Sequence, residues 1–131
     1  MIIDEQILNE LSLQATENKR LRMNLNFHDN LEDDVQRLLN AMEPGTVLPV
    51  HRHKNTEVTY FVLRGKVEVL IYDDNKQLKS KEILSPHEGK YGIHIAKGEW
   101  HNLNVLEKGT VIFEVKKGPY KILSENDIMH L

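Results

Sequence analysis

Short apolar runs separated by glycine-containing turns dominate the chain from Gly45 onward. Residues 58–63 and 66–72 flank Arg64-Gly65, and this arrangement predicts two strands joined by a tight turn. Five more extended segments are expected, over residues 46–53, 78–84, 91–95, 100–105 and 110–115. Because so many short strands recur at intervals of roughly ten residues, the sequence predicts a mainly β fold, either a sandwich or a small barrel.

The first third of the chain has a different pattern, which predicts two helices. Asp4 can cap the first helix, and Asn30 can cap the second, which Gly45 would end. Both have apolar residues at helical spacing. In the first these are Ile7, Leu8, Leu11 and Ala15, and in the second Leu31, Val35, Leu38, Leu39 and Met42. Residues 21–27 alternate between apolar and polar, which predicts a strand between the helices.

The length of 131 residues suits one domain with a core of its own. We expect residues 1–44 to form a helical and strand segment that packs on a barrel, residues 45–123 to form the barrel, and residues 124–131 to form a C-terminal tail. Gly118-Pro119 marks the expected end of the sheet region.

Composition excludes several classes of function. The net charge of -3 gives no basic surface for nucleic acid or an anionic membrane. The absence of cysteine excludes disulfides, thiolate metal sites and cysteine nucleophiles. No run approaches the ~20 apolar residues of a membrane span, and the acidic start has no long apolar stretch typical of a signal peptide. A cytoplasmic protein is therefore expected.

Three of the seven histidines form the most distinctive chemical pattern. His51 and His53 are two residues apart, so on a strand their side chains point to the same face. A single histidine is more often a hydrogen-bonded or surface residue than a ligand. A pair on one face, joined by His101 from another strand, could instead hold one divalent metal. The expected metals are Zn²⁺, Ni²⁺, Fe²⁺ and Mn²⁺, and no organic cofactor is expected.

The spacing of these residues resembles the two motifs of the cupin superfamily. The first motif has matching positions at Gly45, His51, His53, Glu57 and Gly65. Gly98-Glu99-Trp100-His101 resembles the core of the second, with Ala96 where proline is usual. The resemblance implies a small cupin β-barrel, a double-stranded β-helix or jelly roll, here preceded by the two helices. In such barrels the motifs lie on facing strands and their histidines converge on one metal.

The resemblance extends to the WbuC-type cupin metalloproteins over residues 5–123. The matching segments are 22–28, 35–41, 43–46 and 114–120. It implies one divalent ion bound by His51, His53, His101 and Glu57. Such proteins are often encoded near genes for surface polysaccharides, which implies a sugar-derived substrate. Their reaction does not follow from the resemblance, so the catalytic residues stay unassigned and enzymatic activity stays open.

Two ways of counting place Glu57 differently. Counted back from Gly65, the usual cupin glutamate position is Val58, and Glu57 points away from the metal. Counted forward from His53, Glu57 has the spacing and direction of a ligand. A bulge between Thr56 and Thr59 would reconcile the two counts. Without Glu57, three imidazoles and water still form an adequate set of ligands.

Two other functions remain open. A metal-free sugar-nucleotide isomerase or epimerase would use His51 and His53 as acid and base, since some cupins of that kind carry the same short string, His51-Arg52-His53-Lys54. A non-catalytic cupin would use the barrel only to bind a small molecule. The expected partners are a small-molecule ligand and, because cupins commonly dimerise, a second copy of the chain.

Several further polar residues allow two interpretations. Arg22, Asn24 and Asn26 alternate with apolar residues, which is typical of the solvent-facing side of an edge strand. The other interpretation is a row that faces the substrate at the mouth of the barrel. Glu114 would be either exposed or a buried acid, and Tyr60 would mainly fill space.

Overall fold

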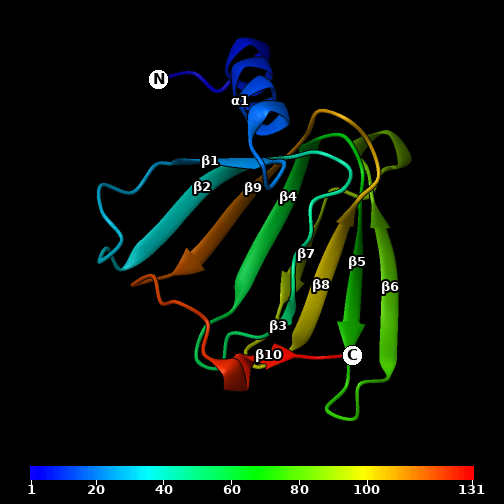
Figure 1. Ribbon diagram of the computed structural model, residues 1–131. Helices are drawn as coiled ribbons and strands as arrows, with labels where there is room; N and C mark the ends of the chain where they lie inside the picture. Colours follow the sequence, from blue (N-terminus) through cyan, green and yellow to red (C-terminus); the bar gives the residue numbers. More distant parts are fainter.

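Two five-stranded antiparallel sheets face each other in the computed structural model, which describes residues 1–131 (Figure 1). Sheet one contains, in spatial order, β1 (Arg22–Asn26), β2 (Val35–Met42), β9 (Thr110–Lys117), β4 (Val58–Arg64) and β7 (Gly92–Ile95). Sheet two contains β10 (Ile128–Met129), β3 (Val50–His51), β8 (Trp100–Val105), β5 (Val67–Tyr72) and β6 (Leu78–Leu84). The mainly β fold predicted from the sequence is confirmed.

The main core lies between the sheets, on what we call their inner faces. Strands β4 and β5 bury every second residue there, as expected when one face of a sheet is covered. The buried residues of this core are Met42, Val58, Tyr60, Val62, Val67, Val69, Ile71, Leu84, Ile95, Leu103, Val105 and Ile112. Register with these residues therefore identifies which other side chains lie on the inner faces.

One helix, α1 (Glu5–Glu17), covers the outer face of sheet one (Figure 1). Asp4 caps it as predicted, since its carboxylate accepts a hydrogen bond from the Ile7 N–H at 3.1 Å. The apolar stripe of α1 packs on the sheet in a second core made of Leu8, Leu11, Ala15, Leu39, Ala41 and Val111. No helix in the structure has the length and apolar character needed to span a membrane.

The second predicted helix is wrong, because residues 35–42 form strand β2. This strand lies between β1 and β9 and is covered on both sides. Leu39 and Ala41 lie under α1, whereas Met42 lies in the main core between the sheets. Apolar residues therefore occur on both faces of the strand, and their spacing along the sequence resembles that of an amphipathic helix.

The C-terminal residues return to sheet two beside the histidines. Short 3₁₀ helices occur at η1 (Pro86–Glu88) and η2 (Glu125–Asp127), and β10 follows η2. In β10, Ile128 is in register with His51 of β3. Next to His51, Arg52 donates a hydrogen bond to the Asp127 carboxylate at 3.1 Å, and its guanidinium lies 4.4 Å from the centre of the Trp100 ring. These contacts hold the segment that carries the histidine pair, which is β3 and the residues just after it.

Candidate metal centre

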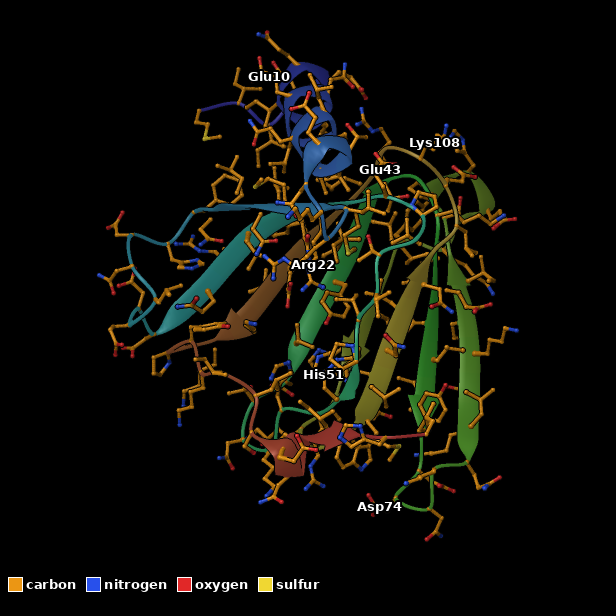
Figure 2. The ribbon with its side chains drawn as sticks, in the orientation of Figure 1. Glu10, Arg22, Glu43, His51, Asp74 and Lys108 are labelled. Carbon is orange, nitrogen blue, oxygen red and sulfur yellow. The ribbon has the colours of Figure 1, made fainter.

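Three histidines converge between the sheets, from β3, the residues just after it, and β8. His51 is in register with His101 across the β3–β8 pair, and His101 is in register with Ile71 of the main core. Ring centres are 4.3 Å apart for His51 and His101, 5.1 Å for His51 and His53, and 6.0 Å for His53 and His101. One nitrogen from each ring lies within 4.8 Å of the others. Figure 2 shows His51 in the space between the two sheets.

Two of the rings are held by backbone carbonyls that lie just before their strands. Nδ1 of His51 lies 2.9 Å from the Pro49 carbonyl oxygen, and Nδ1 of His101 lies 2.9 Å from that of Glu99. A carbonyl only accepts, so each Nδ1 carries the proton and each Nε2 keeps a free lone pair. Nε2 of His101 is buried with no hydrogen-bond partner. This is the arrangement that metal-binding histidines adopt, with one nitrogen fixed by an outer hydrogen bond.

Burial also keeps these imidazoles neutral. It lowers the pKa of His51, and together with the neighbouring His51 it lowers the pKa of His53 to about 4 and that of His101 to about 3. Lys116 acts in the same direction on all three pKa values. Neutral imidazole is the form that binds a metal. An acid–base catalyst works best with a pKa near the working pH, so the same shifts count against the metal-free interpretation.

The donor set fits a divalent ion. Three neutral nitrogen ligands suit zinc, nickel and ferrous iron, and they leave coordination positions for water or a substrate. The buried, unpartnered Nε2 of His101 is the strongest sign of this fit, because a buried polar atom without a partner costs free energy that a bound ion would recover.

Tyr60, Glu114 and Lys116 lie on the inner face of sheet one near the histidines. Tyr60 of β4 is in register with Glu114 of β9, and the centre of its ring is 6.5 Å from that of His101. Lys116 Nζ lies 3.7 Å from a Glu114 carboxylate oxygen. Burial raises the pKa of Glu114, and Lys116 opposes that rise. Glu114 is therefore a buried acid, one of its two expected positions.

Sequence reasoning did not identify Lys116. The available signal was its parity, since Lys116 follows Glu114 by two residues on the same strand and so shares its face. Only the structure shows that this face lies toward the histidines.

Residues 3–84 match a protein family described as Domain of unknown function (DUF6016). The chain belongs to this family. No curated protein matches its sequence.

Solved structures show that this DUF6016 chain has the cupin fold. KdgF from Halomonas sp. aligns with a TM-score of 0.60 and 17% identity, over 76% of this chain and 82% of KdgF. The capsular polysaccharide assembling protein CapF from Staphylococcus aureus aligns with a TM-score of 0.64 and 20% identity, over 87% of this chain and 32% of CapF. Oxalate decarboxylase from Bacillus subtilis, which has Mn(II) centres, aligns with a TM-score of 0.57 and 17% identity, over 84% and 28%.

Glu57 does not join the histidine cluster of the DUF6016 chain. Its carboxylate lies 3.1 Å from Nε2 of His94, and Nδ1 of His94 lies 2.9 Å from the Thr59 hydroxyl. Val58, the next residue, lies in the main core. The geometry thus follows the count made backward from Gly65.

We therefore expect Glu57→Gln to leave the affinity for zinc within about twofold of the wild-type value, because Glu57 contacts His94 rather than the three histidines. Competition with a chromophoric chelator measures that affinity. A loss of tenfold or more would return Glu57 to the set of ligands.

Proposed function

We propose that this DUF6016 chain is a metalloprotein that holds one divalent ion at His51, His53 and His101 and uses it to act on a sugar-derived small molecule. The observation that carries the proposal is the pair of Nδ1–H groups bonded to backbone carbonyls, which turns the Nε2 atoms of His51 and His101 toward the cluster. The buried Nε2 of His101 has no partner within the protein. A bound metal ion would supply a partner for this nitrogen.

The surroundings of the histidines suit chemistry at an oxygen-rich ligand. A bound divalent ion would polarise a carbonyl or hydroxyl group, or lower the pKa of a bound water. Glu114, whose pKa burial raises, holds a proton more readily than an exposed glutamate does. Lys116 places a positive charge beside it. Tyr60 is buried and its aromatic ring lies beside His101 on the β4 side of the cluster.

Two likenesses support a sugar-derived substrate and a role in surface polysaccharide biosynthesis. The sequence resembles the WbuC-type cupins over most of its length. The fold is similar to CapF, which is described as a capsular polysaccharide assembling protein. The chain aligns with 32% of CapF, so CapF supports the class of substrate and not the reaction.

Elemental analysis of protein purified without a metal-affinity tag tests the proposal. We expect close to one ion of a divalent transition metal per chain, and a rise in melting temperature when Zn²⁺, Ni²⁺, Mn²⁺ or Fe²⁺ is added to stripped protein. Binding to the folded state alone stabilises it by about 2.7 kcal/mol at a free metal concentration of roughly 100 times Kd. Less than about a tenth of an ion per chain, with no rise for any metal, would contradict the proposal.

A further inference from the structure

The polar residues of β1 lie on the inner face of sheet one. Arg22 is in register with Met42, which belongs to the main core, and Asn24 is in register with Asn40. Asn26 is in register with Leu38, which is in register with Glu114. Side chains in register share a face of a sheet, so the row of β1 continues across β2 and β9 to the acid beside the histidines. We call Arg22, Asn24 and Asn26 the β1 row.

The β1 row is accessible although it lies on an inner face. Asn24 and Asn26 are exposed, and Arg22 is half-buried. In Figure 2, Arg22 and His51 both lie on the side of sheet one that faces sheet two. Three alternate residues of a strand span about 13 Å. A ligand that contacts Arg22 and also reaches the Asn26 end of the row, which is in register with Glu114, is therefore an extended molecule rather than a single small ion.

Arg22 has no anionic partner. Its one hydrogen bond reaches the Val47 carbonyl oxygen at 3.4 Å, and no carboxylate lies within 4.0 Å of its guanidinium. Burial and the nearby Arg20 lower the pKa of Arg22, which shows that the charge is held at a cost. Guanidinium binds carboxylate and phosphate with two parallel hydrogen bonds. An anion at Arg22 would offset the cost.

Asn40 supplies a second, independent sign of a ligand. Its Oδ1 is buried and has no hydrogen-bond partner. Asn40 lies between Asn24 on β1 and Ile112 on β9, and so occupies the middle of the inner face. An amide oxygen accepts a hydrogen bond from a hydroxyl group, and leaving a buried acceptor unpaired is costly.

We propose that the inner face of β1, β2 and β9 binds a polyhydroxylated anion, such as an acidic sugar or a sugar phosphate, with its anionic group on Arg22 and its hydroxyl groups on Asn24 and Asn40. The opposite end of the ligand lies toward Lys116 and the histidines. This inference rests on the proposed function for the metal end of the ligand. It adds the charge of the ligand and its direction across the sheet.

Isothermal titration calorimetry on the zinc-loaded full chain tests the inference with three probes: glucuronate, glucose 6-phosphate and glucose. We expect at least one of the two anionic sugars to bind ten times or more tightly than glucose, and the tighter of the two identifies the anionic group. Arg22→Ala should weaken that binding by about 10- to 100-fold, the usual range for a charge-assisted hydrogen bond. Asn24→Ala, at an exposed position, should weaken it by about fivefold.

Arg37→Ala is the matched control, because Arg37 is an exposed arginine on β2 whose register places it on the outer face, beside Leu39 and Ala41. Its binding should stay within about twofold of the wild-type value. Equal binding by the Arg22→Ala and Arg37→Ala proteins, or no preference for either anionic sugar over glucose, would overturn the inference. The sugar titration on metal-free protein separates the two proposals. If elemental analysis shows that the chain binds no metal, the proposed function fails. Sugar binding that depends on Arg22 in the metal-free protein would still support this inference.

Discussion

We expect His101→Ala to abolish the proposed metal binding, with a loss of affinity for zinc of more than about 100-fold. Outer hydrogen-bond partners of a metal-binding histidine are already worth about 10- to 100-fold in affinity, and the loss of a ligand costs more. His101 is the most buried member of the cluster, it is in register with His51, and its buried Nε2 has no hydrogen-bond partner. Competition with a chromophoric chelator gives the affinity, and elemental analysis gives the bound metal per chain.

His94→Ala is the control for this change. His94 lies on β7 and contacts Glu57 and Thr59, outside the cluster, so its removal should leave zinc binding within about twofold of the wild-type value. The melting temperature of each stripped protein should be measured as well, because His101→Ala also removes a buried side chain. Wild-type zinc affinity in a folded His101→Ala protein would exclude the three-histidine site.

The alternation of apolar and polar residues predicts a strand best where only one face of that strand is buried. Strand β5 alternates between buried and partly buried residues, and its place after the turn at Gly65 follows from the sequence. In β2 the prediction failed, because Leu39 and Ala41 pack under α1 while Met42 packs between the sheets. A strand buried on both faces loses the period of two on which its recognition depends.

The candidate site also contains residues that the sequence places correctly and residues that only the structure places. Spacing along the chain brings His51 and His53 together, because residues two apart on an extended segment share a face. The position of His101 depends on the pairing of β3 with β8, which only the resemblance to the cupin motifs anticipated. The roles of Asn40 and Lys116 depend on register across three strands of sheet one, and the sequence carries no local signal for that register.

Gly65→Ala should be strongly destabilising, because Gly65 lies where the chain crosses from β4 in sheet one to β5 in sheet two. Its φ is +94°, and a Cβ added there would lie 2.2 Å from the hydroxyl oxygen and 2.7 Å from Cα of Thr110. Thr110 is fully buried, and its hydroxyl group accepts from Lys66 N–H and donates to the Glu107 carbonyl. The backbone strain costs about 1–2 kcal/mol and the steric overlap about 1–3 kcal/mol, so unfolding free energy should fall by roughly 2–5 kcal/mol.

Gly89→Ala separates the two costs, because Gly89 also has a positive φ, +76°, but no atom lies within 4 Å of an added Cβ. The unfolding free energy of the Gly89→Ala protein should fall only by the cost of the backbone strain, about 1–2 kcal/mol. Urea unfolding of the stripped protein measures the unfolding free energy of both variants. Equal losses for the two variants would mean that Thr110 can move away despite its two hydrogen bonds. A larger loss at Gly65 would show that Thr110 cannot move away, because its hydroxyl group is held by Lys66 and Glu107, and that the close packing of the β4–β5 turn on β9 contributes to the stability of the fold.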